Sequence, residues 1–513
     1  MEKFHKLIHG VVVVWAWIFL SSVFFGMLYS AQLIGFDLFV DTALNPQNVR
    51  SLHITLMLYG PVMLALSLLP FALFDRDKLP LDNIVTPMKN YFLFWHLFLF
   101  MSVVTIMFGV QRELPFYDFA YELNFILAAS GVFYIVAIFR AIKHYDVVPL
   151  WVKVSKVLLF SAPIALLILM NPEIGQVEKT LVGPHGDNTL GMSLTMIPIF
   201  YLLIKLDAKE QFVVRGHIYW IVPLIVYIVS VLYRSFVDGL SYNQEWVAQW
   251  LTFAYAPLLY IWCKDAGIRF TTSPYLKISI WAFLFVMIQG NILFFPEIRA
   301  LFHKNDLVIA HAHIAMAIGI FFMALSVLNY FYEIPKSFAK IWLFAIALMF
   351  FPLTYAGFIE AGFISQDILP MWWMRFLSGV VGVSALFYFI LKHIAIKKYT
   401  PIEYYNVFGF LSDGLGAIVL LAIAPLLFSF LGFEYHVLYN VVFGFMGFVG
   451  VLHFIGIQKH QQLMAELTSL ARIITATIFF ALFLNGTFDG LALLVGSYDI
   501  FFAFVYFILR SRL

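Results

Sequence analysis

Cysteine is nearly absent from this chain, and charged residues are scarce. The single cysteine among 513 residues, Cys263, excludes an intrachain disulfide, a CxxCH attachment motif for c-type haem, a two-cysteine copper centre and an iron–sulfur cluster. Charged residues make up 12% of the chain and the net charge is +2, which is too small to indicate a nucleic-acid-binding protein. Any redox cofactor must therefore be held by histidine, methionine or carboxylate side chains.

Apolar residues fill most of the sequence. They make up 63% of it, and aromatic residues alone account for 19%. Apolar runs long enough to cross a bilayer as helices start near residues 10, 52, 91, 119, 150, 189, 213, 246, 275, 307, 338, 371, 405, 436, 467 and 489, with short connections between them. The sequence therefore predicts an all-α polytopic membrane protein with about sixteen spans in the lipid bilayer and no sizeable soluble domain.

Lysine and arginine collect in alternate connections between these runs. By the positive-inside rule, such loops face the cytoplasm, and the alternation predicts that both termini do so too. The loops are marked by Arg76, Lys78 and Lys89; Arg140, Lys143, Lys153 and Lys156; Lys205, Lys209 and Arg215; Lys264, Arg269 and Lys277; Lys336 and Lys340; Lys392, Lys397 and Lys398; Lys459 and Arg472; and Arg510 and Arg512.

Two histidines lie near the start of one apolar run, DLVIAHAHIAMAIGIFFMALSVLNYF, which covers residues 306–331. Side chains two residues apart on a helix point about 200° apart, so His311 and His313 cannot bind one metal ion together. Each can serve a different site on one flank of the helix. The alternative is that each donates a hydrogen bond to a neighbouring helix or a backbone carbonyl, although ionisable groups at membrane depth are costly and usually functional.

A third histidine begins the second apolar run, in VRSLHITLMLYG. His53 lies about a turn inside the membrane, and Arg50 precedes it at the interface. This pair suits haem, because the iron needs a nitrogen ligand and the propionates need a cation. The alternative is a snorkelling arginine above a packed histidine.

These residues together resemble the catalytic subunit, subunit I, of the haem–copper oxidase superfamily, and most closely the cbb3-type oxidases and nitric oxide reductases. The resemblance rests on Arg50, His53, the HAH motif, His303 eight residues before His311, and WWMRFLSGVVGV with Arg375. It covers residues 1–400 and implies the family's twelve-helix core. Residues 401–513 would then be a C-terminal extension of about four transmembrane helices, in which we expect no intramembrane chemistry.

The resemblance implies two haems. His53 and His313 would be the axial ligands of a low-spin haem b, and His311 the proximal ligand of a high-spin haem. The other matched residues lie near haem propionates in the family: His303, Arg50 and Arg375.

The family's copper ligands are missing. In VGPHGDNTLGMSLT, Asp187 stands where the family has a histidine, and His185, two residues away, is the only substitute. In VSVLYRSFVDG, Arg234 and Ser235 stand where the family has two adjacent histidines. Copper needs about three close imidazoles, so we expect no copper. Arg234 and Asp187 could instead form a salt bridge that closes the pocket over the high-spin iron, or bind an anionic or polar ligand there.

The function implied by the resemblance is that of a diheme membrane oxidoreductase. Electrons from cytochrome c, a quinol or a partner subunit would pass from the low-spin to the high-spin haem, where dioxygen or a nitrogen oxide binds, in a bacterial-type inner (cytoplasmic) membrane. An alternative is a non-catalytic haem-bearing electron-transfer or accessory protein for a respiratory system such as nitrous oxide reduction. A transporter that uses the histidines for protons is a third possibility, but no inverted repeat or broken helix supports it.

Overall fold

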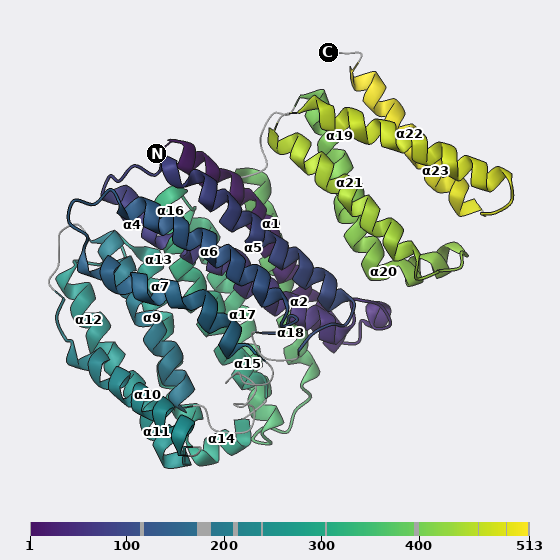
Figure 1. The fold of residues 1–513 in the computed structure, drawn as a ribbon. Coiled ribbons are helices and arrows are strands. Elements are labelled where there is room, and N and C mark those ends of the chain that lie inside the picture. Colours follow the sequence, from purple (N-terminus) through teal and green to yellow (C-terminus); the bar gives the residue numbers. More distant parts are fainter. Residues whose placement is uncertain are drawn as a thin grey trace. The chain divides into compact units, whose positions relative to one another are not determined.

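The computed structural model describes residues 2–112, 117–171, 186–208, 214–237, 240–302, 305–393, 400–459, 461–488 and 490–510. These residues fold almost entirely into helices with short connections, and one isolated bridge joins Gln111 to Phe119 (Figure 1). A helix satisfies its own backbone hydrogen bonds, as a lipid environment requires. The predicted all-α polytopic membrane class is confirmed.

Thirteen helical segments among the described residues are long and apolar enough to cross a membrane. They are Lys3–Leu33, Pro46–Arg76, Asp82–Met107, Leu123–Ile142, Thr189–Asp207, Pro274–Leu293, Asp306–Phe331, Lys336–Glu360, Leu369–Ile390, Pro401–Leu431, Tyr439–Ile457, Gln462–Leu484 and Gly490–Arg510. The other three of the sixteen predicted runs are helical but have shorter apolar stretches or breaks: α7 (Leu150–Leu169), α10 (Ile218–Phe236), and α11 (Tyr242–Trp250) followed by η5 (Leu251–Ala254) and α12 (Tyr255–Asp265). The protein is therefore a multi-pass membrane protein.

The chain forms two compact units. The main unit comprises Met1–Phe36 and Val49–Ile394, and the C-terminal unit comprises Asp37–Asn48 and Ala395–Leu513. The short segment Asp37–Asn48 belongs to the C-terminal unit although sequence analysis places it in the first domain. Its Ala43 N–H donates to the Ala422 carbonyl at 3.2 Å.

Two long spans of the main unit carry the histidines. The first consists of α2 (Pro46–Met57), the π-helical turn η2 (Leu58–Val62), α3 (Met63–Leu66) and α4 (Leu69–Arg76). The second consists of α15 (Asp306–His313), the π-helical turn η6 (Ile314–Ile320) and α16 (Phe321–Phe331). A π-helical turn thus follows His53 by five residues and His313 directly, and such turns often mark functional sites.

Neighbouring helices hold these two spans in place. α15 packs against α17 (Lys336–Glu360), η6 against α13 (Pro274–Leu293), and α1 (Glu2–Leu33) against α18 (Leu369–His393), which also lies along α17. The Asn305 side chain caps α15 by accepting from the Leu307 N–H at 3.0 Å. A side chain at Gly357 would meet the Leu307 backbone N at 2.7 Å, so this glycine allows α17 to approach the start of α15.

The remaining helices of the main unit are η3 (Asp82–Ile84), α5 (Val85–Met107), α6 (Leu123–Ile142), α9 (Gly186–Asp207) and α14 (Pro296–Phe302). The core of the main unit also contains packed aromatic rings. Phe19, Phe321 and Trp342 come from three different helices and pack ring against ring, with centroids 4.7 to 5.2 Å apart. Such contacts hold transmembrane helices together where no hydrophobic effect operates between them.

The C-terminal unit consists of η1 (Asp37–Phe39), α19 (Pro401–Gly409), the π-helical turn η7 (Phe410–Leu415), α20 (Gly416–Leu431), α21 (Tyr439–Lys459), α22 (Gln462–Leu484) and α23 (Gly490–Arg510). Thr400 caps α19, and Gly432, with φ of 76°, ends α20 in the left-handed conformation that glycine adopts without strain. α22 and α23 lie side by side (Figure 1).

Candidate functional site

The His53 and His313 side chains face one another in the main unit. Their ring centroids are 6.3 Å apart and the ring planes differ by 18°. His53 comes from α2 and His313 from the last turn of α15, so two spans far apart in the sequence bring these imidazoles together.

Both rings are oriented in the same way, through their Nδ1 atoms. His53 Nδ1–H donates to the Ser22 carbonyl at 2.8 Å, and His313 Nδ1–H donates to the Ile309 carbonyl at 2.8 Å. Because a carbonyl can only accept, these bonds place the proton of each neutral ring on Nδ1. Among the described residues neither Nε2 has a hydrogen-bond partner, so both lone pairs are free to bind a metal. Metal-ligating histidines commonly donate their other ring N–H to a carbonyl in this way.

The spacing of the rings excludes a direct hydrogen bond between them. An imidazole–metal bond is about 2.0 Å and the ring radius about 1.2 Å, so two rings on opposite sides of one metal have centroids about 6.4 Å apart. A direct hydrogen bond between the rings would bring the centroids to about 5.3 Å. The observed 6.3 Å is too long for a direct hydrogen bond and leaves room for a metal between the rings.

Gly26 of α1 sets the position of the His53 ring. A Cβ at this position would lie 2.8 Å from both Nδ1 and Cε1 of His53. The Ser22 hydroxyl, one turn earlier on α1, donates to the His53 carbonyl at 2.9 Å. α1 therefore contacts both the backbone and the ring of His53. Sequence analysis did not predict these contacts, because they join different helices.

His311 faces a different neighbour. Its Nδ1 lies 3.2 Å from Oε1 of Gln289 on α13, and the ring lies against Gly290, where a Cβ would be in ordinary van der Waals contact with His311 Cε1 at 3.4 Å. His311 therefore contacts α13 while His313 faces α2, as expected for residues two apart on a helix. Among the described residues the Nε2 of His311 also has no hydrogen-bond partner.

Arg375 is buried beside the paired histidines. Its guanidinium is close enough to interact electrostatically with both His53 and His313. It lies 3.6 Å from the Asp306 carboxylate and 5.3 Å from the centre of the Tyr29 ring. A cation of this kind suits a carboxylate-bearing ligand, but here Asp306 already offsets part of its charge.

Asp306 is itself held by further polar contacts that sequence analysis missed. Trp372 Nε1–H donates to its carboxylate at 2.9 Å, and the Asp306 backbone N–H donates to Glu360 at 2.7 Å. The signal was present, because Asp306 directly precedes the HAH span and Trp372 lies in the same motif as Arg375. Their contact joins α15 to α18.

Arg50 lies in the first half of α2 and pairs with Asp118, at 3.3 Å. Asp118 also accepts a hydrogen bond from the Ser51 hydroxyl at 3.0 Å. Asp118 lies in the loop between two spans, where burial raises the pKa of its carboxyl and Arg50 and Ser51 oppose the rise. The Arg50 side chain, 39% exposed, therefore already has an anionic partner.

The other predicted site residues fall outside the described part of the chain. His303 and His185 lie there entirely. Asp187 lies in α9 and Arg234 in α10, but their side chains are not described. The expected absence of copper therefore stays a prediction, as do the two alternatives for Arg234 and Asp187, a salt bridge or the binding of a ligand.

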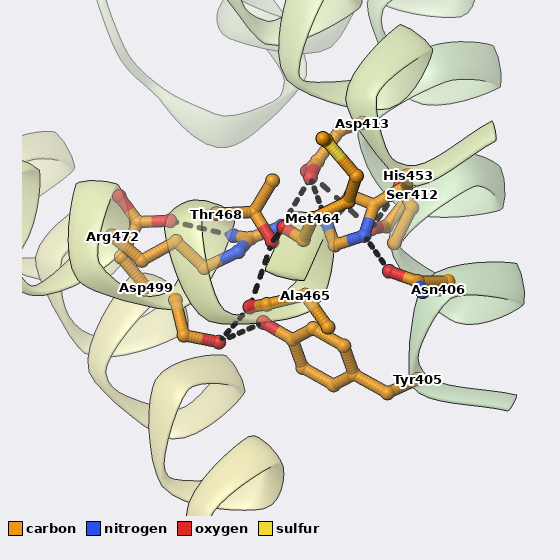
Figure 2. Close-up of polar contacts among 12 residues, drawn as sticks. Tyr405, Asn406, Ser412, Asp413, His453, Met464, Ala465, Thr468, Arg472 and Asp499 are labelled. Carbon is orange, nitrogen blue, oxygen red and sulfur yellow. Dashed lines mark hydrogen bonds and ion pairs between the residues drawn. The ribbon is translucent and has the colours of Figure 1, made fainter. Parts of the chain in front are cut away.

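A second polar cluster lies in the C-terminal unit, for which sequence analysis predicted no intramembrane chemistry. Arg472 Nη1–H donates to Asp499 at 2.7 Å, its Nη2–H donates to Asp413, and His453 packs beside Asp413 (Figure 2). The predicted placement of Arg472 in a cytoplasmic loop is wrong: it lies ten residues inside α22 and is 4% exposed. The signal was a charged residue within each of three apolar runs.

Neither protein-family models nor curated proteins match this sequence. The fold defines the class, a multi-pass α-helical membrane protein. Within the described residues, the main unit carries three histidines on candidate spans whose Nε2 atoms have no hydrogen-bond partner, and the C-terminal unit carries a buried charged cluster.

Proposed function

We propose that this protein is a haem-binding membrane oxidoreductase of the haem–copper oxidase type without the copper centre. The observation that carries the proposal is the pair His53 and His313, with free Nε2 atoms and ring centroids 6.3 Å apart. These two imidazoles would hold a low-spin haem b.

His311 would hold the second haem, the high-spin one. Gln289 orients its ring and leaves Nε2 free on the flank of α15 away from His53. Bound haems would supply one-electron transfer and, at the second site, binding of dioxygen or a nitrogen oxide. The contribution of the chain is to place both ligands on one helix, two residues apart, so that the two sites are neighbours.

Arg375 would compensate the negative charge of haem propionates near the His53–His313 pair. Its burial and its proximity to both rings support this role. Asp306 and Tyr29 keep the guanidinium in place. Arg50, with Asp118 as its partner, has a weaker claim to the same role.

The test is optical spectroscopy of the purified protein with iron and copper analysis. We expect two irons and no copper, a low-spin haem b in reduced-minus-oxidised spectra, and a carbon monoxide adduct of a second haem. His53→Ala and His313→Ala should each remove the low-spin signal and keep the carbon monoxide signal. His311→Ala should remove the carbon monoxide signal and keep the low-spin signal. A protein without iron would refute the proposal.

His96→Ala is the matched control. His96 is also an intramembrane histidine of the main unit, on α5, but its Nε2 already accepts a hydrogen bond from Trp15 at 3.2 Å. We therefore expect this variant to keep both haem signals. Loss of both signals from all four variants would mean that the substitutions act through folding and would leave the ligand assignment without support.

Steady-state consumption of dioxygen or nitric oxide, with a quinol or cytochrome c as donor, tests the catalytic part of the proposal. Turnover would support the oxidoreductase. Two haems without turnover would favour an electron-transfer or accessory protein for a respiratory system such as nitrous oxide reduction. Fractionation of the native cells would test the proposed inner-membrane location.

A further inference from the structure

The charged cluster of the C-terminal unit lies in the middle of its helices. Asp413 belongs to η7, Arg472 to α22 and Asp499 to α23, and none is more than 8% exposed. Arg472 bridges the two carboxylates, and its guanidinium stacks 4.3 Å from the centre of the Phe502 ring. Two carboxylates and one guanidinium carry a net charge of −1.

Membrane interiors disfavour an uncompensated charge of this kind. An ion pair inside a protein offsets its desolvation cost only when the charges balance and the remaining polar atoms are satisfied. One further positive charge is therefore required near the two carboxylates.

His453 is positioned to provide it. The side chain is 0% exposed, and its Nδ1–H donates to Asn406 Oδ1 at 2.9 Å. The opposite nitrogen, Nε2, has no hydrogen-bond partner and points at Asp413, 3.6 Å from Oδ2 (Figure 2). In the neutral ring this nitrogen carries a lone pair, which would face the lone pairs of a carboxylate.

The fold makes room for this arrangement. A side chain at Gly409 would collide with the His453 ring, and one at Gly456 would lie 2.6 Å from Asn406 Nδ2. The charged and titratable groups that face His453 are Asp413 from η7, Arg472 from α22 and Tyr405 from α19, whose ring centroid is 5.4 Å away. α20, which also packs on α21, contains no titratable residue.

We propose that the His453–Asp413 pair is an intramembrane proton-binding site, which holds one proton between His453 Nε2 and Asp413 Oδ2. The proton converts an opposed pair of acceptors into a charge-assisted hydrogen bond and brings the cluster to net neutrality. It requires no redox step and is independent of the haems proposed for the main unit. The C-terminal unit therefore carries its own ionic chemistry.

The experiment is ¹⁵N NMR of the full-length protein in lipid bilayers at neutral pH, labelled at its 14 histidines. His453→Gln assigns the signal by removing it. We expect the wild-type Nε2 of His453 to be protonated, and Asp413→Asn to return it to the neutral form. Asp499→Asn should have the same effect although Asp499 does not contact His453. The reason is that Asp413 and Arg472 alone have no net charge, so the cluster no longer requires a proton on His453.

Glu466→Gln is the matched control, since Glu466 pairs with Arg510 at 2.8 Å in the same unit but at an exposed position. This variant should leave the His453 signal unchanged. Infrared difference spectra of the same samples report on the Asp413 carboxyl. A protonated carboxyl band that Asp413→Asn abolishes also supports the site.

Two results would overturn the proposal. One is an unprotonated His453 Nε2 in the wild type together with no protonated carboxyl band in the infrared spectrum of the wild type. The other is a His453 signal that changes when sodium is replaced by choline, which would assign the site to a metal cation. Both results come from the wild-type protein and the assigning variant, so they decide the matter even if Asp413→Asn does not fold.

Discussion

The close approach of α1 to His53 leads to a prediction for Gly26→Ala, a change that touches no proposed ligand atom directly. The new Cβ would lie 2.8 Å from Nδ1 and Cε1 of His53, whereas ordinary carbon contacts are about 3.5 Å or longer. The ring must therefore shift by about 0.7 Å, or α1 must move away by the same amount.

The cost of this shift has three parts. Overpacking a buried contact costs about 1–3 kcal/mol, and weakening the hydrogen bond from His53 Nδ1–H to the Ser22 carbonyl costs about 0.5–1.5 kcal/mol. Alanine in place of glycine inside a helix recovers about 0.5–1 kcal/mol. The net destabilisation is about 0.5–4 kcal/mol, and Nε2 moves by about a third of the length of an imidazole–metal bond.

The assay combines thermal unfolding with reduced-minus-oxidised spectra. Gly26→Ala should lower the free energy of unfolding and lose most of the low-spin haem signal while keeping the carbon monoxide adduct. Gly10→Ala is the matched control, because Gly10 lies on the same helix and a Cβ there has nothing within 4 Å. We expect it to match or exceed the wild type in stability. A Gly26→Ala protein with wild-type stability and an unchanged low-spin spectrum would refute the claim that α1 sets the position of the His53 ring.

Three further predictions concern stability. Gly409→Ala should destabilise the protein by about 1–3 kcal/mol, because the new Cβ collides with the His453 ring. Gly444→Ala is the control and should not destabilise the protein, since a Cβ at Gly444 has no atom within 4 Å. Equal shifts in the thermal unfolding of the two variants would contradict the prediction. Arg472→Ala should lower the free energy of chemical unfolding by about 3–5 kcal/mol, because two buried carboxylates lose their partner. Arg510→Ala, which removes an exposed ion pair, should lower it by only about 0–1 kcal/mol. Similar losses in the two variants would contradict a buried network. Burial raises the pKa of the Asp118 carboxyl above its usual value of 3.8, so the folded protein binds the carboxyl proton more tightly than the unfolded chain does. The free energy of unfolding should therefore fall as the pH rises from 3.8 through the raised pKa. Asp118→Asn should lack this fall when melting is followed across acidic pH, and an unchanged pH profile would exclude Asp118 as its source.

Several features followed from the sequence alone. The scarcity of charge and the length of the apolar runs determined the membrane class, because the lipid interior admits only helices that satisfy their own backbone bonds. The spacing of His311 and His313 determined that they face different directions, because it depends only on the 100° turn of a helix per residue.

Contacts between helices could not be predicted in the same way. The Ser22 carbonyl and Gly26 lie on α1, Gln289 on α13, and Asp306 meets Trp372 across two spans. Nothing in a single helix indicates which neighbour it will contact. Arg50 and Arg375 were recognised as cations, but their partners Asp118 and Asp306 were not.

The C-terminal unit shows the difference most clearly. The sequence by itself determined that Asp413, Arg472 and Asp499 interrupt three apolar runs, and that these runs cross the membrane. Only the tertiary structure decided that the three charges meet and that His453 joins them with one nitrogen unpaired. The physical reason is that each apolar run can be recognised from its own sequence. Charge compensation depends instead on the distances between side chains of different helices, which the packing of the helices determines.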